Sequence, residues 1–282
     1  MKLYFQIFIF LFPAILFAEA PPVVMEKGKD LYELGFNLDI YEDKTGKLTI
    51  NDVIKPEWLS KFKTSKKKVP NFGFTSSHFW ARVKITNPSK VKGDWFLSFN
   101  YVLQDHVSFY KKENGVWVSE DMGDEKKFSE RKIKVRPFAL EINTEGEQVY
   151  FVKISGGLCQ INLTLVSQKQ MLSKEGEDNQ VYGIFFGIII SMVLYNVFIL
   201  FSTKSYSYFF YVIYVFFYGL FLAGYQGFTQ KYLFYNHPWF SNNGLSFVMG
   251  ISELFLTLFT ISYLNIGAKN KKLFLLFKIN IV

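Results

Sequence analysis

Residues 181–201 read VYGIFFGIIISMVLYNVFILF, an apolar run that contains no Asp, Glu, Lys or Arg. A helix needs about 20 apolar residues to cross the hydrocarbon core of a bilayer, so this run predicts a membrane span. The chain before it is charged and alternates between polar and apolar residues, whereas the chain after it is mostly apolar. The sequence therefore predicts an outer domain attached to a helical membrane region at residues 181–282.

Further apolar runs follow at residues 206–228 and 244–264, and the second of these is interrupted only by Glu253. Each is long enough to predict a span. A fourth run, residues 273–282, has the length of only half a span. We therefore expect three full spans and a partial fourth, in a chain truncated relative to a complete membrane bundle.

The first 20 residues have the layout of a secretory signal peptide: Lys2, an apolar stretch, and the small-x-small site Ala18-Glu19-Ala20. Because Pro21 follows the expected cut, an uncleaved anchor is the alternative. Either arrangement exports residues 21–175, the expected outer domain, with residues 176–180 as a linker.

The distribution of lysine gives the same topology independently. An exported outer domain puts four lysines on the cytoplasmic side and one on the outer side, which agrees with the positive-inside rule. The inner lysines are Lys204, Lys269, Lys271 and Lys272, and the outer one is Lys231. We expect a multi-pass protein of a bacterial inner membrane with a periplasmic N-terminal domain.

Residues 21–175 contain about eight short alternating runs separated by turn residues, which predicts an all-β fold. Asn114-Gly115 between two such runs is typical of a β-hairpin. Leu48–Ile50 is one of the expected strands. Cys159 is the only cysteine, so the domain has no internal disulfide and needs an ordinary apolar core. We expect a two-sheet sandwich of jelly-roll type.

Alternation assigns the two faces of residues 79–85. Phe79, Ala81, Val83 and Ile85 share an apolar face that we expect in the core. Trp80 and Arg82 share the opposite face, where a ring and a guanidinium suit a sugar or a small acidic ligand. The alternative is that Trp80 packs under a loop while Arg82 pairs with a carboxylate such as Asp105.

Catalysis and cofactors have no support in the sequence. No nucleophile elbow, phosphate loop or metal-ligand spacing is present, so we expect no catalytic residues, no metal site and no cofactor. The net charge of +8 is spread over many segments, and an exported domain does not meet nucleic acid. Nucleic acid is therefore not an expected partner.

Four residues of the predicted spans are candidates for coupling between helices. Gly183 and Gly187, with Ser191, form a small-residue seam that suits packing within the bundle or a homodimer. Glu253 and Asn196 are polar groups inside the bilayer, where such groups need a partner. Glu253 also suggests an ion-coupling role.

The order of several segments resembles the bacterial seven-transmembrane receptors with diverse intracellular signalling modules (7TMR-DISM). The matching segments are Phe79–Arg82, Asp105–Tyr110, Arg131, Tyr182–Gly187, Tyr195-Asn196 and Ser207–Tyr214. The resemblance implies an outer domain similar to carbohydrate-binding modules, seven spans, and a cytoplasmic output such as a diguanylate cyclase, histidine kinase, adenylate cyclase or phosphatase. Asp105, Tyr110 and Arg131 lie in matched segments and join Trp80 and Arg82 as candidate ligand-binding residues.

These observations predict a membrane receptor whose outer domain binds a small molecule, with carbohydrate as one candidate class. The linker at residues 176–180 would pass the signal to the first span, and a separate or downstream polypeptide would supply the output. Two alternatives remain open: a transporter or channel component, and a membrane-tethered binding module without its own signalling.

Overall fold

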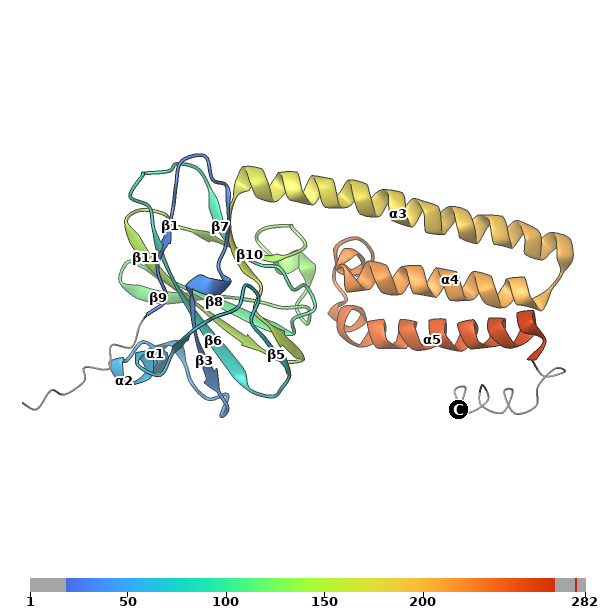
Figure 1. Ribbon diagram of the computed structural model, residues 1–282, viewed down its shortest axis with the longest axis horizontal. Coiled ribbons are helices and arrows are strands. Elements are labelled where there is room, and N and C mark those ends of the chain that lie inside the picture. The colour runs from blue at the N-terminus through green and yellow to red at the C-terminus, as the bar shows by residue number, and fades with distance from the viewer. Residues whose placement is uncertain (1–18, 267–276, 278–282) are drawn as a thin grey trace, which may run out of the picture.

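The computed structural model describes residues 19–266 and residue 277. Figure 1 shows a β domain on one side and long helices that run side by side away from it. The expected signal peptide and the partial fourth span lie almost entirely outside the described residues. The described part therefore tests the outer domain and the first three spans.

Two sheets form the body of the β domain. Within the described residues, the larger sheet has seven strands in the order β4-β3-β6-β11-β8-β9, with β1 beside β6. Its strands are β1 (Val23–Val24), β3 (Leu38–Asp43), β4 (Lys63–Thr64), β6 (His78–Thr86), β8 (His106–Glu113), β9 (Val116–Met122) and β11 (Glu147–Ser155).

The smaller sheet of the described chain has four strands in the order β10-β7-β13-β2. These are β2 (Leu31–Glu33), β7 (Trp95–Phe99), β10 (Phe138–Ile142) and β13 (Leu163–Ser167). A short ribbon pairs β5 (Asn71–Phe74) with β12 (Leu158–Gln160). The domain also contains two single turns of 3-10 helix, Gly35–Asn37 and Phe128–Glu130.

The core lies between the two sheets, as alternation predicted. Phe79, Ala81, Val83 and Ile85 are each 1% exposed, and they pack against inward residues of the smaller sheet such as Leu97. The predicted hairpin is also confirmed: Asn114 and Gly115 join β8 to β9 with φ of 50° and 85°. These positive φ values fit the tight turn that Asn-Gly favours. The two-sheet arrangement is confirmed, and the jelly-roll connectivity stays a prediction.

The expected strand at Leu48–Ile50 is wrong. Helix α1 (Ile50–Val53) begins there, because Thr49 and Asp52 form a capping box in which each side chain bonds to the other's backbone. Helix α2 (Pro56–Leu59) follows, with proline in its first turn. Together with Phe62, this segment forms a second apolar cluster on the outer face of the larger sheet.

Three long helices follow within the described residues, each long and apolar enough to cross a membrane. They are α3 (Gln168–Thr203), α4 (Tyr206–Tyr225) and α5 (Pro238–Leu264). Ser167 caps α3 by accepting from the Gln170 amide. Residues 176–180, the expected linker, are inside α3, so the β domain is joined to the first span by a continuous helix.

Helix α4 ends earlier than the sequence predicted. The expected span continued to residue 228, but Gly227 has a φ of 78° and reverses the chain direction. A short π-helix, η3 (Thr229–Leu233), then leads toward α5. This turn faces the β domain, and its contacts form the junction described below (Figure 1).

Candidate functional site

The face that carries Trp80 and Arg82 is closed. Trp80 is 0% exposed and packs with Phe62 and Phe151, beneath the segment that contains α1 and α2. The Tyr110 ring lies 5.3 Å from the Trp80 ring. The expectation that Trp80 stacks on a ligand at an open surface is therefore wrong for this structure. The segment that contains α1 and α2 covers Trp80, and the alternation of the strand residues gave no sign of that segment.

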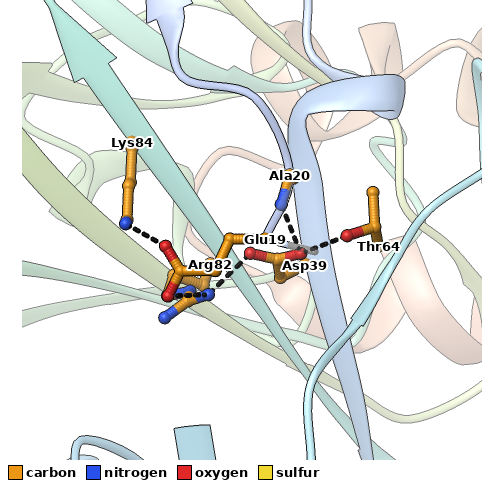
Figure 2. A network of polar contacts seen from close by, with 6 residues as sticks. All are labelled: Glu19, Ala20, Asp39, Thr64, Arg82 and Lys84. Atoms are coloured by element: carbon orange, nitrogen blue, oxygen red, sulfur yellow. Dashed lines mark hydrogen bonds and ion pairs between the residues drawn. The ribbon is translucent and has the colours of Figure 1, made fainter. Parts of the chain in front are cut away.

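Arg82 is 5% exposed and pairs with Asp39, with 2.7 Å between Nη2 and Oδ2. It thus pairs with a carboxylate, as the alternative reading held, but the partner is Asp39 and not Asp105. Figure 2 shows that Asp39 also accepts from the Ala20 amide at 2.9 Å and the Thr64 hydroxyl at 2.8 Å. Both oxygens of Asp39 thus accept hydrogen bonds from groups of this chain, and Arg82 is bonded to a buried carboxylate instead of facing an open surface.

The segment before Pro21 takes part in the same network. Glu19 lies 3.3 Å from Arg82 Nη2 and forms an ion pair with Lys84 (Figure 2). Cleavage after Ala20 would remove both the Glu19 carboxylate and the Ala20 amide from this network. The network joins the N-terminal segment to strands β3, β4 and β6.

Asp105 sits in a confined place beside two glycines. A Cβ atom at Gly156 would lie 2.4 Å from Asp105 Oδ2, and one at Gly123 would lie 1.8 Å from the Asp105 carbonyl oxygen. Burial, reinforced by Glu125, raises the pKa of the Asp105 carboxyl. Asp105 therefore packs into the loops near Asp124 and does not meet Arg82.

Arg131 is the candidate residue that reaches the membrane part of the chain. It is 7% exposed, and its Nη1 donates to the carbonyls of Val135 and Arg136 at 3.3 and 2.9 Å. Its Nη2 donates to Gln230 Oε1 at 2.7 Å. Burial lowers the pKa of Arg131 to about 10, and the nearby Asp124 opposes that change.

Gln230 of η3 is the matching part from the membrane side. It is 4% exposed, and its Nε2 donates to the carbonyls of Asp124 and Lys126 at 3.1 and 3.2 Å. Close by, the Phe128 amide donates to the Tyr235 carbonyl at 3.0 Å, and the two rings lie 5.3 Å apart. The loop between α4 and α5 is thus docked on residues 124–131 of the β domain.

A second set of contacts binds the first turns of α3. Arg136 Nη2 bonds to Asp178 Oδ2 at 2.6 Å, and its Nη1 donates to the Gln226 carbonyl at 3.3 Å. Lys231 pairs with Glu175 at 2.5 Å. We call the residues of these two sets the junction: Asp124, Arg131, Arg136, Glu175, Asp178, Gln230 and Lys231.

Burial shapes the charge of the junction. Asp124 is 3% exposed, and burial, then Asp105 and Glu125, raise its pKa to about 7. Its Oδ1 has no hydrogen-bond partner among the described residues. A cavity of about 250 Å³ also lies here, between the smaller sheet, Arg136, Asp178 and Tyr225.

Sequence reasoning found Arg131 but missed Arg136, Gln230 and Lys231. One signal was available: Lys231 is the only Asp, Glu, Lys or Arg between residues 206 and 252. A lone charge next to a membrane span needs a partner, and Glu175 supplies it. Gln230 had no such signal, because its partners are mostly backbone carbonyls.

The candidates inside the spans lie apart from the described helix contacts. Gly183 and Gly187 have open space where a Cβ would be, whereas a Cβ at Gly219 would lie 2.9 Å from Ile189. Asn196 donates to the Met192 carbonyl of its own helix at 2.8 Å. Glu253 is exposed on α5. Among the described helices, close approaches therefore occur at Gly219, against α3, and at Gly224, where a Cβ would lie 2.6 Å from Leu245 of α5, and not along the predicted seam.

Comparison with known proteins gives two family matches along the chain. Residues 35–167 match the family model described as 7TMR-DISM extracellular 2. Residues 178–282 match the one described as 7TM diverse intracellular signalling. No curated protein matches the chain. The matches agree with the β domain and with the apolar helices, and the chain belongs to the 7TMR-DISM family, with an extracellular domain of the second type.

Proposed function

We propose that this receptor-family chain senses a small polar ligand with its β domain and passes the signal into its membrane helices through the junction. A cytoplasmic module supplies the output, and the β domain binds its ligand without catalysing a reaction. The observation that carries the proposal is Gln230, which inserts between Arg131 and the carbonyls of Asp124 and Lys126.

The junction suits this task because it holds the β domain at two places. Arg136 and Asp178 join the domain to the stalk, the part of α3 before the span. Arg131 and Gln230 join it to the loop between α4 and α5. A ligand that shifts the domain must move α3 relative to α4, or break one of the two contacts. Either result changes the balance between two helix arrangements.

The proposed location is a bacterial inner membrane with the β domain in the periplasm. The β domain contacts the α4–α5 loop, so the two share one side of the membrane, and the α3–α4 turn with Lys204 is at the other end of the helices (Figure 1). In a Cys159→Ser background, Asn236→Cys should react with an impermeant thiol reagent on intact spheroplasts and Lys204→Cys should not. The reverse pattern would contradict the topology.

Coupling is tested at the contact between α3 and α4. Ile189 packs against Gly219, so the reactivity of Ile189→Cys in the Cys159→Ser background reports on that contact. The full chain in nanodiscs is titrated with a panel of sugars and organic acids, and a bound ligand should change the reactivity. Gln230→Leu should keep binding and lose the change in reactivity, whereas Tyr232→Leu, an exposed neighbour, should keep both. A ligand that binds and leaves the reactivity unchanged would contradict coupling.

A further inference from the structure

A second cavity lies in the β domain at the free edge of the larger sheet. Its volume is about 490 Å³, and strand β3, strand β4 and the segment from residue 65 to residue 72 form its walls. Four of the lining side chains are lysines: Lys61, Lys63, Lys66 and Lys67. We call this cavity the lysine pocket.

The positive charge of the lysine pocket is largely uncompensated. Among the described residues, Lys63, Lys66 and Lys67 have no carboxylate within ion-pair distance, whereas Lys68, which does not line the pocket, pairs with Glu33 at 2.8 Å. Glu42 is the acidic residue of the lining, and it accepts from the Ser77 hydroxyl at 2.8 Å. Charges of one sign around a concavity attract a counter-ion.

The backbone that carries the lysines is held in place. The Ser65 amide donates to the Leu38 carbonyl at 2.8 Å, and the Pro70 carbonyl accepts from the Ile161 amide at 2.8 Å. Between these anchors, Gly35 packs so closely that a Cβ there would lie 1.9 Å from the Lys68 carbonyl oxygen. Lys66 and Lys67 therefore extend from a fixed backbone, so binding of an anion there needs no ordering of the loop.

An aromatic ring borders the same cavity. Phe72 stacks on Phe79 with ring centroids 4.1 Å apart, yet Phe72 is 43% exposed while Phe79 is 1% exposed. One face of Phe72 is thus covered and the other is available for a flat or sugar ring. Lysine on an edge strand also prevents pairing with another sheet, but that role concerns Lys63 and leaves the exposed ring unexplained.

We propose that the lysine pocket binds a small organic anion that carries a phosphate group and a ring. The lysines bind the anionic group, and the ring lies on Phe72. The proposal names a ligand class for the sensing function proposed above. Binding in the pocket does not depend on that function; only the claim that binding produces a signal rests on it.

The test uses the full chain in zwitterionic lipid nanodiscs and measures binding of four probes by calorimetry. Glucose 6-phosphate and phenyl phosphate should bind, inorganic phosphate should bind more weakly, and glucose should not bind. A comparison of the first two tells a sugar ring from an aromatic one. Raising the salt concentration should weaken binding, because exposed charges are screened. The proposal would be overturned if glucose bound as tightly as glucose 6-phosphate, or if inorganic phosphate bound as tightly as the two ring phosphates.

Matched variants locate the site. Lys63→Gln with Lys66→Gln should lower the affinity roughly tenfold, as expected for two partly exposed ion pairs. Lys44→Gln with Lys47→Gln removes the same charge from exposed lysines elsewhere and should leave the affinity unchanged. Phe72→Leu should weaken the binding of the two ring phosphates and leave the binding of inorganic phosphate unchanged. If the two double variants lost affinity equally, the assignment of the binding site to this pocket would be overturned.

The two proposals fail in different ways. If a ring phosphate binds in the lysine pocket but the reactivity of Ile189→Cys does not change, the coupling fails and the pocket stands. If neither ring phosphate binds, the lysine pocket proposal is overturned, while coupling is still tested by the wider ligand panel.

Discussion

Two buried arginines of the β domain show how the same residue type is used differently. Arg82 is 5% exposed and Arg131 is 7% exposed. Arg82 bonds to the Asp39 carboxylate within the domain, whereas Arg131 bonds to backbone carbonyls and to the side-chain amide of Gln230 from the membrane part. Arg82 thus stabilises contacts within one domain, whereas Arg131 joins that domain to another part of the chain.

The acceptors account for this difference. A buried arginine with a carboxylate forms a strong charge-assisted pair, and loss of either member leaves an uncompensated charge. Carbonyl and amide acceptors are uncharged, so water can replace them at lower cost when the surfaces separate. We therefore expect the Arg82 network to be permanent and the Arg131 contacts to be exchangeable.

The largest expected effect comes from the Arg82 network. Asp39→Ala removes the acceptor of Arg82, Thr64 and the Ala20 amide, and should lower the free energy of unfolding of the β domain by about 3–5 kcal/mol. Thermal unfolding of the full chain, followed by tryptophan fluorescence, measures this. Asp94→Ala, at an exposed carboxylate, is the control and should have little effect. Equal effects of the two substitutions would remove the distinction between the arginines.

The two-layer core was predictable because strand alternation reports directly on burial, as Phe79 and Val83 illustrate. Alternation cannot reveal a third layer, and so it placed Trp80 on an open face although α1 and α2 cover that side. The capping box of Thr49 and Asp52 was legible in the sequence, but the apolar Leu48 and Ile50 around Thr49 suggested a strand instead.

The second prediction concerns the exchangeable contacts. Gln230→Leu should keep the β domain folded and cost the junction about 1–3 kcal/mol, because Arg131 and two carbonyls lose their partner. Hydrogen exchange should then increase at residues 124–136 and 226–236 and stay unchanged in strand β6. Tyr232→Leu is the control, since Tyr232 is 59% exposed. Faster exchange across the whole β domain would show that the junction supports the fold itself.

The junction was less predictable than the fold for a physical reason. Its partners are up to 106 positions apart, as for Gln230 and Asp124, and many of the accepting groups are backbone carbonyls that every residue has. A contact can be recognised from the sequence only when the side chain itself is unusual for its position. Lys231, a charged residue between two apolar segments that pairs with Glu175, is such a case. Arg131 was found by family resemblance, and its partner in η3 was not.

A third prediction uses pH. Burial, then Asp105 and Glu125, raise the pKa of Asp124 to about 7 from an ordinary value near 4. The folded junction therefore binds a proton that the unfolded chain releases, so its stability should fall as pH rises from about 4 to about 7. The slope is at most about 1.4 kcal/mol per pH unit for one proton. Asp124→Asn should remove this part of the pH dependence, measured by hydrogen exchange at residues 124–136 between pH 5 and pH 8. An unchanged slope in the variant would assign the pH dependence to other groups.

The smallest expected effect lies at the exposed end of the Arg82 network. Glu19 is half exposed, and its hydrogen bond with Lys84, then the charge of Arg82, lowers its pKa against the opposing effect of burial. Its contribution to stability is therefore present above its ordinary pKa and lost as pH falls through the lowered value. In the uncleaved chain, which keeps Glu19, Glu19→Gln should cost about 0.2–1 kcal/mol at neutral pH, and high salt should reduce that cost, because exposed ion pairs are screened. The cost of Asp39→Ala should not respond to salt, because Asp39 is buried with its partner. Thermal unfolding of wild type and the two variants at low and high salt measures the cost of each substitution. If salt changed the two costs equally, water would reach Arg82 as freely as it reaches Glu19.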